Sequence, residues 1–293
     1  MTSNKRHVIT QSAFIIGKTQ HAQECYQESN QTSCNLAFTN SPNLNLLTIS
    51  FFLFLFAATP SLLFGQQKDV VKSNQQWFQY YNQTKLNNNL TLLYDGSYRW
   101  KDRFQKKSQY LIRAAIGYNI NSDIQISSGI AHLGFYFSDK LITVEFRPYQ
   151  EILVKNKFNK IGMNHRYRIE ERFFYPVDNG EIQKLGTFNF RFRYAFMFSI
   201  PLFKLSKTKT DKAFLLNIGD EIFINAGKEV VNGIFDQNRI IVSPTFKLNE
   251  SLSLSLTWNS QFASTQSQDI FNYTNVYWFQ IKHNLKIGKK QKE

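Results

Sequence analysis

The chain has 293 residues, of which 16% are aromatic, with 28 Phe and 14 Tyr against only 2 Cys and 6 Pro. This composition favours strands over helices, and a mean hydropathy of −0.37 excludes a bundle of membrane helices. A membrane β-barrel remains compatible, because every second residue of its strands faces water. The formal charge of +14 suggests a polyanionic partner. The basic residues are scattered and match no nucleic-acid-binding motif, so we expect no nucleic-acid partner.

The longest apolar run is residues 46–64, LLTISFFLFLFAATPSLLF. It contains Pro60 and is followed by Gly65 and two glutamines, which is typical of a signal-peptide apolar region and cleavage site. We therefore predict a signal peptide at 46–65, cleaved after Gly65, and a barrel domain at 66–293. Residues 1–45 are expected to be a dispensable extension or the result of a start codon assigned too far upstream. Both cysteines fall in this extension, so the barrel domain offers no disulfide or thiol site.

From Gln76 onward the apolar residues recur with a period of two, in segments of roughly ten residues separated by turn residues. In residues 188–198, six aromatic side chains share one parity, while Asn189, Arg191 and Arg193 share the other. In a strand these two sets point to opposite faces. Eleven strands are predicted on this basis, in chain order 76–84, 90–100, 109–120, 124–137, 142–151, 161–173, 188–198, 214–226, 239–247, 251–258 and 277–287.

The connectors between these strands differ in length. Short Asn- or Asp-rich turns are expected at 87–89, 121–123 and 249–250, and longer polar loops at 101–107, 176–184, 227–235 and 263–273. Outer-membrane barrels have short periplasmic turns and longer external loops. We therefore predict an all-β, antiparallel, up-and-down transmembrane β-barrel in the bacterial outer membrane.

The strand number follows from a general rule. Bacterial single-chain barrels have an even number of strands, so we expect twelve, with residues 69–75 as the additional one, and ten as the alternative. Pro148 and Pro244 lie inside predicted strands and lack a backbone donor, so each predicts a bulge or a sheet edge.

Charged residues cluster on one parity of several strands. In Arg166-Tyr-Arg-Ile-Glu-Glu-Arg172, four charged residues alternate with residues expected to face lipid. A charge in the hydrocarbon layer costs roughly 2–4 kcal/mol, so these side chains are expected to face the lumen. The predicted luminal set is Glu145, Arg147, Arg166, Arg168, Glu170, Arg172, Arg191, Arg193 and Arg239. Three interpretations stay open: interlocked ion pairs that fill the lumen, an anion-binding constriction of a narrow pore, and catalysis by paired carboxylates.

Other chemistry finds little support in the sequence. His165 and His283 are expected on the lipid side, and neither they nor His132 has a Ser or Asp partner at a spacing typical of a hydrolase. No histidine pair has metal-ligand spacing, and no Gly-rich phosphate loop is present. We therefore predict a monomeric protein without catalytic residues, metal or other cofactor. The expected partners are outer-membrane lipids, with anionic solutes and lipopolysaccharide phosphates as further candidates.

Three segments carry a family resemblance. Glu145-Phe-Arg147, His165-Arg-Tyr-Arg-Ile-Glu-Glu-Arg-Phe173 and Phe235-Asp-Gln-Asn-Arg239 follow an export signal and an early Trp77. In this order they resemble the exported bacterial family known as domain of unknown function 2490, over about residues 76–286. The resemblance implies a Gram-negative envelope protein with a barrel fold, and it implies no activity.

Two alternatives to a pore or structural barrel remain open. One is a barrel-embedded lipid-modifying enzyme. The other is a soluble periplasmic barrel that binds an apolar ligand, in which the aromatic face of residues 188–198 would line the interior. The membrane interpretation is favoured by the aromatic content of that face and by four tryptophans near strand ends, where aromatic girdles occur: Trp77, Trp100, Trp258 and Trp278.

Overall fold

The computed structural model describes residues 69–206, 212–230, 233–265, 267 and 269–287. The predicted extension at 1–45 and signal peptide at 46–65 lie outside these ranges. The described residues form strands and connecting turns. Within them, no helix is long and apolar enough to cross a membrane.

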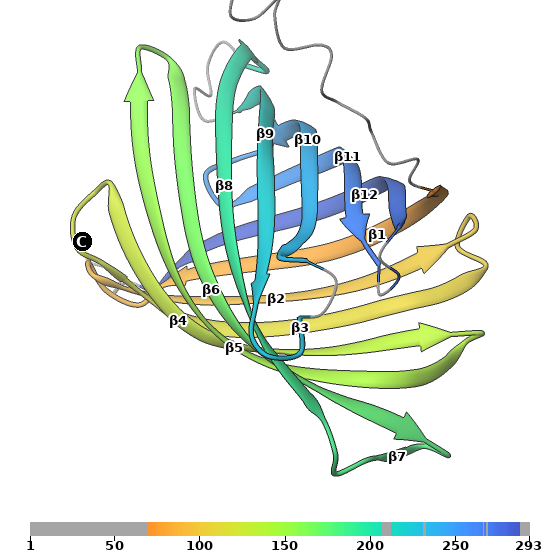
Figure 1. Cartoon of the computed structure of the whole chain (residues 1–293). Coiled ribbons are helices and arrows are strands. Elements are labelled where there is room, and N and C mark those ends of the chain that lie inside the picture. The colour runs from red at the N-terminus through yellow and green to blue at the C-terminus, as the bar shows by residue number, and fades with distance from the viewer. Residues whose placement is uncertain (1–68, 207–211, 231–232, 266, 268, 288–293) are drawn as a thin grey trace, which may run out of the picture. The chain divides into compact units, whose positions relative to one another are not determined.

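Eleven strands form the wall of a closed β-barrel, and a twelfth, β7, pairs only with β6 (Figure 1). The strands are β1 (Asp69–Lys85), β2 (Leu90–Lys101), β3 (Lys106–Asn119), β4 (Ile124–Phe137), β5 (Lys140–Phe158), β6 (Ile161–Asp178), β7 (Glu181–Ile182), β8 (Thr187–Lys204), β9 (Ala213–Ala226), β10 (Phe235–Lys247), β11 (Leu252–Ser264) and β12 (Ile270–Lys286). The all-β class and the total of about twelve strands are confirmed. The additional strand is β7, however, and residues 69–75 are the beginning of β1.

The barrel closes between its first and last strands. Neighbouring wall strands are antiparallel everywhere else, but β1 and β12 pair in parallel, from Asp69 with Ile270 to Lys85 with Lys286. The prediction of a wholly antiparallel barrel is wrong at this seam, because in a meander with an odd number of wall strands the first and last run in the same direction. Aromatic pairs hold the seam: the rings of Trp77 and Trp278 are 5.2 Å apart, and those of Phe78 and Phe279 are 5.7 Å apart.

The strands are staggered around the barrel. Starting at Lys85 and moving from each residue to its paired residue on the next strand, the path passes Glu151 of β5 and Gln237 of β10. After one circuit of the barrel it returns to β1 at Val71, fourteen residues before Lys85. Such a shear tilts the strands relative to the barrel axis. A residue at the same height along the barrel axis therefore lies a little over one residue away from the directly paired residue on the next strand.

The two ends of the barrel differ. The connectors 86–89, 120–123 and 248–251 lie together at what we call the short-turn end. In each, an asparagine side chain (Asn87, Asn121 or Asn249) accepts two backbone N–H bonds at 2.7–2.9 Å, which is the mechanism of an Asx turn. At the opposite end, the loop end, β9 and β11 end and β8, β10 and β12 begin.

Pro148 and Pro244 do not produce the expected bulges. Pairing on the β6 side of β5 stops at Phe146 and resumes at Tyr149, and pairing on the β11 side of β10 stops at Val242 and resumes at Thr245. The register is the same before and after each interruption. The missing proline donor therefore costs ladder hydrogen bonds without inserting a residue.

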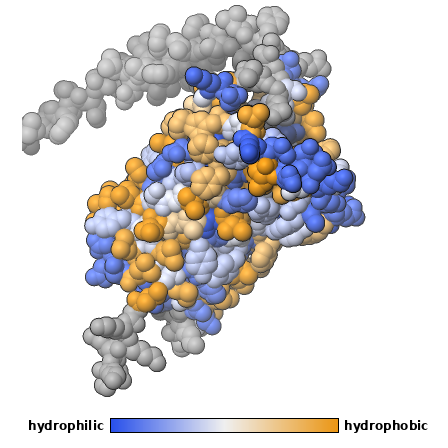
Figure 2. All heavy atoms as spheres, turned by 90° about the horizontal axis from the view of Figure 1, so that it is seen from below, coloured by the Kyte–Doolittle hydropathy of each residue, from blue (hydrophilic) through white to orange (hydrophobic). Residues whose placement is uncertain are grey.

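The two faces of the wall have opposite polarity. Large apolar side chains point outward and stay exposed, among them Ile112 (62%) and Phe192 (44%), and Figure 2 shows apolar residues spread over the face that it presents. The opposite parity carries the charged residues, which are buried in the interior. These faces are the reverse of what a soluble barrel with an apolar interior requires. The aromatic ladder of residues 188–198 is on the outside.

Candidate functional site

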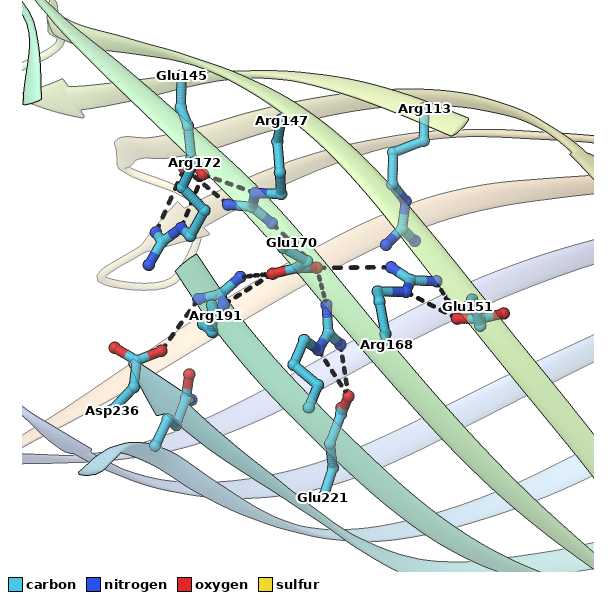
Figure 3. A network of polar contacts seen from close by, with 12 residues as sticks. Arg113, Glu145, Arg147, Glu151, Arg168, Glu170, Arg172, Arg191, Glu221 and Asp236 are labelled. Carbon is cyan, nitrogen blue, oxygen red and sulfur yellow. Dashed lines mark hydrogen bonds and ion pairs between the residues drawn. The ribbon is translucent and has the colours of Figure 1, made fainter. Parts of the chain in front are cut away.

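Charged side chains from five neighbouring strands meet inside the barrel. They form a set that we call the luminal network, drawn in part in Figure 3, and it comprises Glu145, Arg147 and Glu151 on β5, Arg166, Arg168, Glu170 and Arg172 on β6, Arg191 and Arg193 on β8, Glu221 on β9 and Asp236 on β10. Strand alternation turns these residues inward, except for Asp236, which is the extra residue of a register shift between Phe235 and Gln237 on β10. Eight members of the predicted luminal set are in this network, and the ninth, Arg239, lies beside it.

Glu170 is at the centre of the network and is fully buried. Its Oε1 lies 2.6 Å from Arg193 Nη1, 3.6 Å from Arg147 Nη1 and 3.7 Å from Arg168 Nη1. Its Oε2 lies 2.6 Å from Arg191 Nη2. One carboxylate thus connects four guanidinium groups from three strands. A buried charge is tolerated only when it is paired and hydrogen-bonded in this way.

Glu145 forms a second, two-sided junction toward the loop end. Its two oxygens accept bonds from Arg147 Nε at 2.6 Å and Arg147 Nη2 at 2.7 Å. Arg172 Nε approaches the same carboxylate at 2.8 Å. Bidentate guanidinium–carboxylate contacts are among the strongest polar contacts in proteins, and the contact of Arg172 with Glu145 joins β6 to β5 by side chains as well as by backbones.

Glu221 and Glu151 connect the network toward the short-turn end. Glu221 Oε1 is 2.5 Å from both Arg193 Nη2 and Arg166 Nη2, and Glu151 Oε2 is 2.5 Å from Arg168 Nη2. The side chain of Arg166 is 30% exposed, so this part of the network meets solvent.

A separate ion pair lies on the other side of the interior. Arg113 of β3 donates to both oxygens of Asp95 of β2, from Nε at 2.8 Å and from Nη2 at 2.9 Å, and Gln79 of β1 also donates to Asp95. Six interior arginines and carboxylates are absent from the predicted luminal set: Asp95, Arg99, Arg113, Glu151, Glu221 and Asp236. The sequence does hold a signal for Glu151, which shares the parity of Glu145. Apolar and polar residues do not alternate regularly around Glu221, so the sequence does not indicate which face it occupies.

Two interior arginines have no close carboxylate. Arg239 Nη1 is 3.8 Å from Glu221, and Arg99 Nη1 bonds the amide oxygen of Gln109 at 2.5 Å. Both guanidinium groups lie near the ring of Trp77, at 5.6 Å and 3.8 Å from its centroid. Trp77 therefore serves as an interior cation–π partner.

Two of the four tryptophans expected in a girdle are thus placed wrongly by the sequence reasoning. Trp77 and Trp278 lie inside, because they share the parity of the buried Gln79 and Gln280. Trp100 and Trp258 have the outward parity.

Side chains fill the middle of the barrel. Each wall strand contributes an interior residue that is at most 9% exposed: Gln79, Asp95, Leu111, Leu133, Glu145, Glu170, Arg191, Glu221, Ser243, Thr257 and Val276. In a water-filled channel these side chains would be accessible from the lumen. The interior side chains therefore pack against one another over several levels of the barrel.

The histidines of the described chain lie on the outer face, each beside a tyrosine of a neighbouring strand. The Nδ1 atoms of His165 and His283 are 2.9 Å from the hydroxyls of Tyr194 and Tyr80. His132 Nδ1 is 3.2 Å from the hydroxyl of Tyr110. No group of three or more His, Cys, Asp or Glu residues in the described ranges is placed to hold a metal ion.

Comparison with known proteins assigns the chain to a family. The family described as protein of unknown function (DUF2490) matches residues 74–272. The chain belongs to this family. The match runs from β1 into β12 and includes every residue of the luminal network, so the network lies within the part that defines this DUF2490 protein. No curated protein and no solved structure matches the chain.

Proposed function

We propose that this DUF2490 protein is a barrel of the Gram-negative outer membrane, exported by a cleaved signal peptide, whose lumen is closed and whose role is structural rather than catalytic. The observation that carries the proposal is the combination of an apolar outer face with a charged interior filled by side chains. Water would penalise the outer face, at roughly 25 cal/mol for each Å² of apolar surface left exposed. A lipid bilayer removes that penalty.

The outer wall also has features that suit lipid. A groove of about 820 Å³ runs over several strands and is lined mainly by outward apolar residues, including Ile116, Ile152, Ile169, Phe192 and Ile224. In a bilayer, acyl chains would fill this groove. The three Tyr–His pairs of the outer face lie away from the middle of the wall. His165 and His283 lie near the short-turn end, and His132 lies nearer the loop end. Amphipathic rings in such positions suit the two membrane interfaces.

The closed interior is consistent with the barrel size. Eight strands leave room only for side chains or one small ligand, whereas aqueous channels occur at roughly 16–18 strands. Eleven wall strands with arginine, tyrosine and tryptophan side chains inside are closer to the first case. The luminal network would then rigidify the wall and block diffusion.

A narrow anion pore is the second candidate. Its support is the charge balance of the described interior, where nine arginines face six carboxylates: Arg99, Arg113, Arg147, Arg166, Arg168, Arg172, Arg191, Arg193 and Arg239 against Asp95, Glu145, Glu151, Glu170, Glu221 and Asp236. A positive excess in a lumen favours anion passage.

Two measurements test the proposal. The protein should fractionate with the outer membrane, resist carbonate extraction and begin at or near Gln66 by mass spectrometry. Recovery in the soluble periplasmic fraction would refute the membrane location. In planar bilayers the purified barrel should stay silent, whereas anion-selective conductance that is lost in Arg193→Ala would favour the pore.

A further inference from the structure

The short-turn end carries a concentration of lysines on the luminal side of the wall. Lys85 of β1, Lys155 and Lys157 of β5, Lys247 of β10 and Lys286 of β12 share the inward parity of Gln79, Glu151, Thr245 and Gln280 on the same strands. We call these five residues the lysine collar. They are separate from the luminal network, which is built from arginines deeper in the barrel.

The register places the collar lysines at one height. Lys85 and Lys286 are direct partners across the β1–β12 seam. Glu151 of β5 and Gln237 of β10 are the residues reached from Lys85 by following paired residues from strand to strand. Because of the shear, the residues at the same height as Lys85 along the barrel axis lie closer to the short-turn end, about five residues after Glu151 and about ten after Gln237. Lys155, Lys157 and Lys247 are the luminal residues at these positions.

Among the described residues, the carboxylate nearest the collar on its own strands is Glu151, four residues before Lys155, and it is already paired with Arg168 and Arg166. The collar's luminal neighbours near the strand ends are uncharged: Asn119, Gln125, Asn164, Ser253 and Asn284. The acidic residues of the described short turns are Asp123, whose backbone oxygen accepts the N–H of Lys155 at 2.7 Å, and Glu250. Within the described ranges, the lysine that forms an ion pair is Lys106, which is at the loop end.

The loop end has a different charge pattern. Its lysines are mixed with acidic residues, among them Asp69, Asp102, Asp139, Asp178 and Asp269. The local positive excess is therefore a property of the short-turn end.

The residues below the collar extend this positive surface inward. Lys282 lies on the same face of β12, two residues before Asn284 and four before Lys286, with Nζ 5.7 Å from the centre of the Tyr81 ring. The Arg166 side chain of the luminal network is partly exposed and adds a further positive charge on this side of the network. Beyond Arg166 the luminal network closes the interior, so an anion that enters this end would meet the collar first and stop above the network.

We propose that the lysine collar binds phosphate groups. Lysine ammonium groups are compact charges that bind phosphate from several directions, whereas planar bidentate recognition is a property of arginine. Five such groups around one opening favour a ligand that presents several negative oxygens together. The phosphate can belong to a lipid headgroup or to a soluble phosphorylated anion, and the first of these two sources rests on the proposed membrane location.

The test compares two triple variants with the same change in charge. The collar variant combines Lys85→Gln, Lys155→Gln and Lys247→Gln. The control combines Lys72→Gln, Lys140→Gln and Lys184→Gln at the loop end, where the substituted side chains are exposed. Unfolding in urea must be the same for both variants and the wild type before binding is compared.

The first arm titrates the detergent-solubilised full chain with inorganic tripolyphosphate by calorimetry. The wild type should bind with an affinity that falls as salt rises, the collar variant should bind about tenfold more weakly, and the control should match the wild type. In the second arm the proteins are reconstituted into phosphatidylcholine vesicles with or without phosphatidylglycerol and then extracted with detergent. Native mass spectrometry counts the lipid molecules that stay bound to each protein. Selective loss of phosphatidylglycerol from the collar variant would identify a headgroup as the source.

A response in the first arm alone supports a soluble phosphorylated anion. If neither arm separates the collar variant from the control, the proposal is overturned, and equally tight binding of triglutamate would overturn the choice of phosphate. The first arm needs no bilayer. Its outcome is therefore independent of whether the protein fractionates with the outer membrane.

Discussion

Glu170 neutralises more arginine charge than any other carboxylate of the luminal network. Its carboxylate is fully buried and lies within 3.7 Å of guanidinium nitrogens of Arg147, Arg168, Arg191 and Arg193. Glu170→Gln keeps the shape but leaves these cations facing one another. Breaking a buried ion pair by neutralising one partner costs roughly 3–5 kcal/mol. We expect a loss of this size in the free energy of unfolding, measured with urea.

The neighbouring residue provides the control. Glu171 has the opposite parity and makes one long contact, 3.4 Å from Gln150 Nε2, on the outer face. Glu171→Gln should change the free energy of unfolding by less than about 1 kcal/mol. Equal losses in the two variants would mean that Glu170 does not act through the buried arginines.

Substitutions at Phe192 test whether the outer face of the barrel is surrounded by lipid. It is the sixth of the 18 residues of β8, pairs with Ile169 and Ile224, and is 44% exposed, while its neighbour Arg193 points inward. In a bilayer, Phe192→Arg should lower stability by about 2–4 kcal/mol, and Phe192→Leu should change it little. Folding into lipid vesicles, followed by urea titration, measures both. A Phe192→Arg variant as stable as the wild type would contradict the membrane proposal.

At the scale of strands, glycines mark where neighbouring elements approach most closely. A Cβ at Gly129 of β4 would lie 2.4 Å from the backbone oxygen of Ala114 on β3, whereas one at Gly96 of β2 would meet nothing within 4 Å. Gly129→Ala should therefore destabilise the barrel by about 1–3 kcal/mol. Gly96→Ala should stabilise it by roughly 0.5–1 kcal/mol, because alanine loses less backbone freedom. The same sign of change in both variants would refute this account of the β3–β4 contact.

The existence of the strands was predictable, but their closure was not. Alternation identified all eleven wall strands because each has one apolar and one polar face, and period-two patterns are a local property of the sequence. The parallel seam depends on partners about two hundred positions apart, such as Trp77 and Trp278. β7 has two residues, Glu181 and Ile182, too few to show any periodicity. An even-number rule applied to the strand count therefore pointed to the wrong segment, residues 69–75.

At the scale of the whole molecule, the sequence predicted which arginines face inward but not which carboxylates they meet. Parity along one strand fixes the face of Arg166 or Arg193. The identity of a partner such as Glu221 depends on inter-strand register, which accumulates over several turns and bulges. Whether side chains fill the lumen is likewise a property of all eleven strands together.

The orientation of the barrel in the membrane is a prediction at this largest scale. If short turns face the periplasm, the loop end faces the outside. Glu250→Cys and Lys184→Cys place one thiol at an exposed position at each end. An impermeant maleimide applied to intact cells should label Lys184→Cys, and should label Glu250→Cys only after the outer membrane is permeabilised. The parent protein serves as the control: because Cys25 and Cys34 belong to the segment proposed to be removed, it should remain unlabelled. Reversed labelling would show that the lysine collar faces the outside and that lipopolysaccharide phosphates are the phosphates within its reach. Labelling of both variants on intact cells would be incompatible with a barrel that spans the membrane.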